Sequence, residues 1–202
     1  MAGDVDAGKA IEAARKFAGL KGMDVTNNSY YVDPFEFWCG DQPEQAPAME
    51  AVRRAVDWST KRGTVHAAAA GNSSYDLSNK TTNDSSPNDG TSVERTINSS
   101  CKDIPTELDG VVTVSSVDRQ GKLSSFSNRG LGSIDVSAPG RSILSTIVKD
   151  NGWGLKSGTS MASPHVAGVA ALVQSALATA SRDPLTPAAL ESLLKETARA
   201  FP

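Results

Sequence analysis

The sequence predicts a three-layer α/β fold, in which helices cover both faces of a doubly wound parallel sheet. Short apolar segments alternate along the 202-residue chain with longer segments whose apolar residues recur at helical spacing. The apolar segments are short and continuous, as expected for parallel strands that are buried on both faces. Strands and helices in alternation favour a single parallel sheet with crossover helices, and no internal repeat is present.

Four segments are predicted as strands: residues 23–30, 64–70, 110–117 and 134–138. Four others are predicted as helices: residues 8–22, 48–62, 159–180 and 186–199. Thr186 is a suitable N-cap for the last helix, with Pro187 in its first position. In sheets of this kind, functional groups gather at the carboxyl ends of strands and at helix N-termini, so chemistry is expected there.

Length and composition indicate one domain, residues 1–202, with a real hydrophobic core. Residues 73–109 are dominated by Ser, Thr, Asn, Asp and Pro, and they show no apolar periodicity. We expect them to form a long polar loop excursion rather than a second domain. The formal net charge is −3, so nothing indicates a nucleic-acid partner or a membrane partner. The longest apolar stretch, residues 166–173, is too short to cross a bilayer.

The two cysteines, Cys39 and Cys101, both lie in polar, loop-like sequence. A disulfide between them would suit an exported protein, and two unrelated thiols are the alternative. Residues 2–9 contain two aspartates and lack the basic start and apolar run of a signal peptide. On this basis the protein is either cytoplasmic or lacks its natural N-terminus.

The most informative segment is GTSMASPHVAG, residues 158–168. Ser160 lies at the start of a long predicted helix, where free backbone N–H groups and the helix dipole stabilise negative charge. Gly158 and Ala162 are small enough to let another backbone approach closely. A serine at this position could also be a simple helix cap.

This segment resembles the nucleophile motif of the subtilisin-like serine peptidases almost position for position. Other segments are similar to further parts of that family: AAAGN (68–72) to its oxyanion segment, DVTNNS (24–29) to a strand lining its cleft, and SFSNRG (125–130) and IDVSAPG (134–140) to segments preceding its nucleophile. The resemblance covers most of residues 9–199. It implies the subtilisin-like fold, incomplete at the N-terminus and also at the C-terminus.

The resemblance implies that Ser160 attacks a peptide carbonyl and forms an acyl-enzyme. Asn72 would donate its side-chain amide to the oxyanion together with the backbone N–H of Ser160; by itself it could be a turn residue after a glycine. The resemblance places two walls around the substrate, one of Ser29, Tyr30 and Tyr31 and the other of Ala69, Ala70 and Gly71. The tyrosines depart from the Leu-Gly of the common family pattern, and they could instead be surface residues.

Further expectations concern partners and local geometry. The resemblance implies a polypeptide substrate, no cofactor, a secreted parent protein, and a cis bond between Ile104 and Pro105. Asp135 matches a position near which some relatives bind a weak cation, but a lone aspartate on a strand is usually structural, so we expect no metal.

A serine hydroxyl needs a base to take its proton, and the family supplies a histidine oriented by an aspartate. The chain contains two histidines. His165 follows Ser160 by five residues on one helix, about 140° around its axis and about 7.5 Å along it. His66 lies up to about 20 Å back along the strand that leads to Asn72. We therefore expect neither to be the base, His66 to be a core residue, and the chain to be inactive by itself.

Three alternatives are open to different degrees. A pseudo-peptidase would keep the cleft but bind extended peptides without cutting them. A serine-carboxyl peptidase would have Asp at the oxyanion position, where this chain has Asn72. An α/β-hydrolase esterase would have Gly-x-Ser-x-Gly, and Ala162 breaks that pattern.

Overall fold

The computed structural model describes residues 22–87, 90–148 and 152–200. Its centre is a parallel sheet in the order β1 (Val25–Asn28), β3 (Val65–Ala69), β7 (Val111–Val117) and β8 (Val136–Pro139). Val25 pairs with Val65, His66 with Val111, and Val114 with Val136. All four predicted strands are therefore present in one parallel sheet. The predicted helix at residues 8–22 lies almost wholly outside the described residues.

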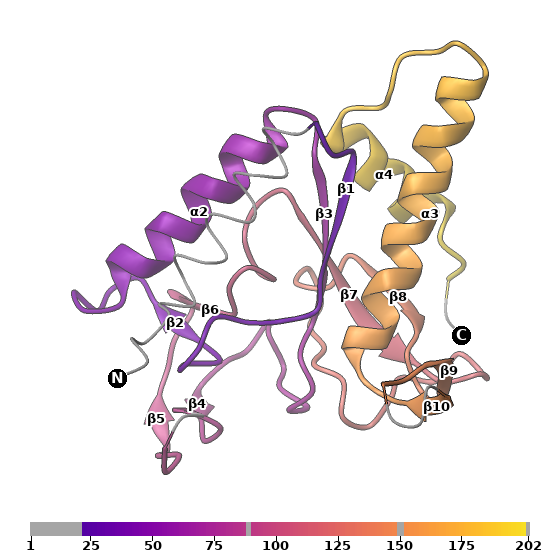
Figure 1. Cartoon of the computed structure of the whole chain (residues 1–202). Helices are drawn as coiled ribbons and strands as arrows, with labels where there is room; N and C mark the ends of the chain where they lie inside the picture. Colours follow the sequence, from indigo (N-terminus) through magenta and orange to yellow (C-terminus); the bar gives the residue numbers. More distant parts are fainter. Residues whose placement is uncertain (1–21, 88–89, 149–151, 201–202) are drawn as a thin grey trace.

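Helices cover both faces of this sheet, as Figure 1 shows. Helix α2 (Ala46–Thr60) lies on one side, and α3 (Thr159–Thr179) and α4 (Pro187–Thr197) lie on the other. Helix α2 begins two residues before the predicted start, because Pro47 occupies its first turn, where a missing N–H has no cost. The hydroxyl of Thr186 accepts a hydrogen bond from Ala189 N and so caps α4 as predicted.

Strands β3 and β7 are buried along their whole length because each face packs against helices or loops. One cluster joins the sheet to α3 and α4 and includes Val65, Val112, Val166 and Leu190. A second cluster lies on the opposite face of the sheet, where α2 contributes Val52 and Val56. The carboxyl ends of β1 and β3 and the N-terminus of α3 meet at one edge of this three-layer arrangement.

The segment at residues 73–109 is more structured than its polar composition predicts. Its described residues form three two-residue strands, β4 (Thr82–Asn83), β5 (Arg95–Thr96) and β6 (Cys101–Lys102); β4 pairs with β5, and β6 pairs with β2 (Trp38–Cys39). Leu77 and Ile97 are buried with Phe37 around the Cys39–Cys101 disulfide. Of the two possibilities considered for the cysteines, the structure contains the disulfide. This bond attaches the polar excursion to the segment after β1.

Two features were not predicted from the pattern of the sequence. Strands β9 (Ile143–Thr146) and β10 (Trp153–Lys156) pair as an antiparallel ribbon beside the start of α3 (Figure 1). Most of its residues are exposed, so no burial pattern marks them. Helix α3 is also long and apolar enough to cross a membrane by length and composition, although it packs on all four strands of the sheet.

Candidate active site

Ser160 is the second residue of α3, and its half-buried side chain lies where the helix presents unpaired N–H groups. The preceding Gly158 supplies no side-chain cap. Ser29, just after β1, donates its hydroxyl to Ser160 O at 3.0 Å. Ser163 in the same helical turn donates to Asn27 Oδ1 at 2.7 Å. The end of β1 and the first turn of α3 are therefore fixed to each other.

Asn72 follows β3 and is oriented by the first residue of α3. Its Oδ1 accepts hydrogen bonds from Thr159 N at 2.8 Å and from Thr159 Oγ1 at 3.0 Å. A backbone N–H can only donate, so the atom that faces it has to be the amide oxygen. The Nδ2 group of Asn72 is consequently left to donate elsewhere, beside the N-terminus that carries Ser160.

Gly71 and Asn128 hold the turn that carries Asn72. Gly71 has a φ of 98°, and a Cβ at this position would collide with Nδ2 of Asn128, so only glycine fits. Asn128 is fully buried; it donates to Ala70 O at 2.8 Å and accepts from Ser73 N and Tyr75 N. Asn128 lies in the family-like segment SFSNRG, but no role for it was predicted from the sequence. The sequence gives no further indication of Asn128, because the burial of a polar residue is seen only in the fold.

A cleft of about 270 Å³ lies in front of Ser160. We call it the Ser160 cleft; its lining residues are Ser29, Tyr30, Tyr31, Asp33, Ala69, Gly71, Asn72, Asp103, Thr159 and Ser160. Both predicted walls are therefore brought together around the serine. Ala70 is the exception: it is fully buried, its N–H donates to Val114 O in the sheet, and it does not line the cleft. Successive residues of a strand point to opposite faces, which explains why Ala69 and Ala70 differ.

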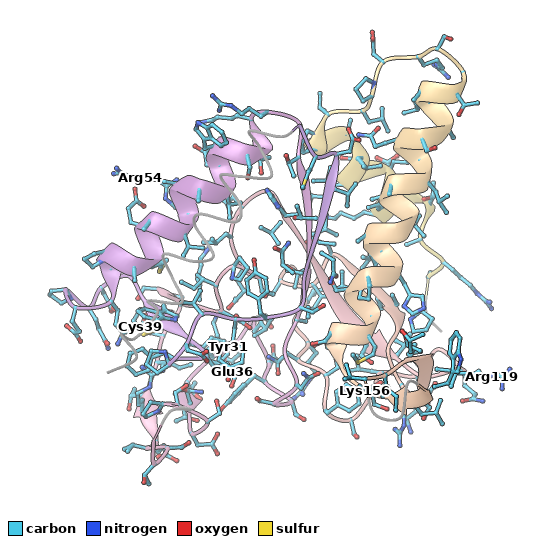
Figure 2. All side chains as sticks on the ribbon, viewed as in Figure 1. Tyr31, Glu36, Cys39, Arg54, Arg119 and Lys156 are labelled. Carbon is cyan, nitrogen blue, oxygen red and sulfur yellow. A yellow bond between two sulfur atoms is a disulfide. The ribbon has the colours of Figure 1, made fainter. Side chains whose placement is uncertain are left out.

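The two tyrosines of the cleft wall, Tyr30 and Tyr31, are partly exposed, each 37%. The hydroxyl of Tyr30 donates to Asn28 Oδ1 at 2.8 Å, and Asn28 in turn donates to Ala67 O. Tyr30 is thus attached to the sheet rather than loose on the surface. Tyr31 lies on the connection that leads from β1 to Glu36 (Figure 2).

Neither histidine reaches Ser160. His66 is fully buried on the α2 side of the sheet, with Nδ1 2.6 Å from Thr26 Oγ1 and Nε2 2.7 Å from Ser59 Oγ. His165 is bonded through Nδ1 to Met161 O at 2.8 Å, and it does not line the Ser160 cleft. The expected core position of His66 is confirmed, and this chain places no imidazole beside the serine hydroxyl.

The cleft also contains an acidic residue that no sequence pattern indicated, Asp103, which is only 2% exposed. Burial raises the pKa of its carboxyl well above the usual range, and the nearby Glu107 and Glu36 raise it further, whereas Lys80 opposes them. Asp103 directly precedes the Ile104–Pro105 bond, which is cis as the resemblance implied. Its role depends on burial, which its polar sequence context does not reveal.

Two acidic positions outside the cleft bear on metal binding. Asp135 is fully engaged with protein groups: Oδ2 accepts from Thr113 N and Oδ1 pairs with Lys195, both at 2.8 Å. Asp41 lies near both cysteine sulfurs, but these are bonded to each other and so are not thiolate ligands. The absence of a metal stays a prediction.

A serine at a helix N-terminus, an oriented amide beside it and an open cleft in front of it together define a site of the acyl-transfer type. The profile of the subtilase family matches residues 2–201, and the chain belongs to that family.

Curated relatives and solved structures agree with this assignment. An extracellular protease of Xanthomonas campestris pv. campestris is 41% identical over 157 residues, which are 75% of this chain and 22% of that protein. Subtilisin DY of Bacillus licheniformis is 37% identical over 85% of this chain and 50% of its own length. A cold adapted subtilisin-like serine proteinase is 29% identical with a TM-score of 0.65, over 94% of this chain and 54% of that one.

A lanthipeptide protease, 24% identical, has the same fold with a TM-score of 0.76 over 96% of this chain and 60% of that one. The chain spans about a fifth of the Xanthomonas relative and half of subtilisin DY. The subtilisin-like α/β fold expected from the sequence is confirmed.

Proposed function

We propose that this chain is the nucleophile-bearing part of a serine endopeptidase, and that Ser160 attacks the carbonyl carbon of a peptide bond. The tetrahedral oxyanion then lies between the backbone N–H of Ser160 and the Nδ2 group of Asn72. The observation that supports this best is the pair of bonds from Thr159 to Asn72 Oδ1, because they engage the oxygen of the amide at the start of the helix and leave Nδ2 as the group that can donate to the oxyanion. A neutral amide held by two bonds needs no rearrangement when negative charge develops.

The proton of Ser160 needs a base that this chain does not bring to the site, since both of its histidines are engaged elsewhere. We propose that the chain alone has no useful peptidase activity and that an oriented histidine from outside these residues completes the site. In subtilisin, itself a member of this family, losing the triad base costs about 10⁶ in kcat. The pseudo-peptidase alternative has less support, because peptide binding alone needs neither Ser160 nor the oriented amide of Asn72.

The substrate is a polypeptide that lies extended along the residues after β1 and pairs with their backbone as an added strand. Relatives named extracellular proteases support secretion of the parent protein.

Chemical rescue tests the nucleophile without assuming where the natural base lies. The purified chain is incubated with a fluorophosphonate probe with and without imidazole, and modification is located by mass spectrometry. Ser160 is expected to react slowly alone and faster with imidazole, which supplies the missing base. Asn72→Ala is expected to slow the rescued reaction by about 10²–10³, the scale known for this donor in subtilisin.

Ser160→Ala and Ser163→Ala serve as matched variants in the same helical turn. The first should abolish labelling and the second should leave it at Ser160. Imidazole-dependent labelling spread over several serines would refute the role of Ser160. Rapid stoichiometric labelling of Ser160 without imidazole would refute the inactivity of the isolated chain.

A further inference from the structure

We propose that the Ser160 cleft accepts the side chain of a lysine or arginine next to the bond that Ser160 attacks, and that the Asp103 carboxylate pairs with its positive charge. The proposal rests on the proposed peptidase function and adds a substrate class to it.

The ionisable groups that line the cleft favour a positively charged ligand. Among the described lining residues, Asp33 and Asp103 carry carboxyl groups, and no lysine, arginine or histidine lines the cleft. The remaining lining residues are small, bear a hydroxyl group, or are the amide of Asn72. An apolar side chain in this cleft would cover a buried carboxylate without compensating its charge, whereas a cation would compensate it.

The Asp103 carboxyl group is only partly satisfied by the protein. Its side chain is almost wholly buried, and Oδ1 makes no hydrogen bond to any described residue. Lys80, the cation whose charge acts on Asp103, pairs instead with Glu107, and the second acidic neighbour is the buried Glu36. A buried acidic group among other acids is costly unless it is paired, so a ligand that brings a positive charge recovers that cost on binding.

The position of Asp103 relative to the reacting bond is fixed by the fold. Asp103 Oδ2 lies 3.5 Å from where a Cβ on Gly71 would lie, and Gly71 directly precedes the oxyanion donor Asn72. Because Asn72, Ser160 and Asp103 line the same cleft, a substrate whose carbonyl oxygen faces Asn72 places an adjacent side chain in the cavity that Asp103 lines.

The segment that carries Asp103 is held rigidly. Thr106 Oγ1 donates to Ala69 O at 2.9 Å, and Ile104 O accepts from Val32 N at 3.1 Å. Asp103 N donates to Glu107 Oε2 at 2.7 Å. Two residues before Asp103, the disulfide fixes Cys101 to Cys39. A carboxylate on so constrained a backbone discriminates between side chains because it cannot move away from the wrong one.

Peptide binding to the full chain tests the proposal without requiring turnover. Three fluorescent peptides that differ only at the C-terminal residue, lysine, norleucine or glutamine, are titrated by fluorescence anisotropy. We expect the lysine peptide to bind about 30-fold tighter than the norleucine peptide, the scale of a buried charge pair. Asp103→Asn should remove this preference. Asp109→Asn, which removes the same charge from an exposed position outside the cleft, should keep it.

Each outcome has a separate meaning. Equal binding of the lysine and norleucine peptides, tighter binding of the glutamine peptide, or an unchanged lysine preference in Asp103→Asn overturns the proposal. If none of the three peptides binds, the proposed peptidase function fails with it. The comparison among peptides uses the unaltered chain, so it stays decisive even if Asp103→Asn fails to fold.

Discussion

Removing the Cys39–Cys101 disulfide by the double change Cys39→Ala and Cys101→Ala should destabilise the chain strongly. The bridge closes a loop with a sequence separation of 62 residues. For a loop of that length, the chain-entropy model gives about 14 cal/mol/K, or about 4 kcal/mol at 25 °C. A typical domain has a free energy of unfolding of only about 5–15 kcal/mol, so a large share of the stability depends on this bond.

Urea unfolding followed by tryptophan fluorescence measures the loss, because Trp38 is buried next to Cys39. The slope of free energy against urea concentration should be compared between the two proteins, since a changed slope signals altered compactness. As a control, wild-type chain refolded in reducing agent should match the double variant. A loss below about 1 kcal/mol, or reduced wild type as stable as oxidised, would refute the entropic reasoning.

Three further predictions concern single residues. Asp103→Asn should stabilise the chain at neutral pH: burial raises the pKa of Asp103 in the folded chain above that in the unfolded chain, so wild-type stability falls as pH rises from the unfolded pKa through the folded pKa, and the variant's advantage in urea midpoint should vanish near about pH 4. His66→Leu should cost about 1–3 kcal/mol by removing the partner of Thr26 and Ser59, yet leave imidazole-dependent labelling of Ser160 unchanged; a large labelling defect in folded protein would contradict its structural role. Thr186→Ala should cost about 1 kcal/mol through loss of the α4 cap, and an unchanged melting temperature would argue against it.

Several features of the fold followed from the sequence because they depend on local patterns. Continuous apolar segments predicted the four parallel strands, and Thr186 with Pro187 predicted the start of α4. The polar excursion was harder to interpret. Its buried residues, such as Leu77 and Ile97, are isolated in sequence and meet only through the β2–β6 pairing and the disulfide.

The motif around Ser160 and the AAAGN segment predicted Ser160 as the nucleophile and Asn72 as its oxyanion donor, and these roles stay predictions. They did not reveal how Asn72 is oriented, since its partner Thr159 is 87 residues away. The wall residues were predicted as a set, and Ala70 is the one of them that does not line the Ser160 cleft, because the direction of a side chain depends on its position along the chain.

The sequence by itself determined the family and the parallel sheet, and it predicted Ser160 as the nucleophile, because these depend on residue types in order along the chain. The tertiary structure decided which polar residues are buried and what they face. It placed Asp103 against the turn before Asn72, although 31 residues separate the two in sequence. The charge and the partners of a carboxylate depend on how deeply it is buried and on which residues from elsewhere in the chain lie beside it. The residues next to it in the sequence indicate neither.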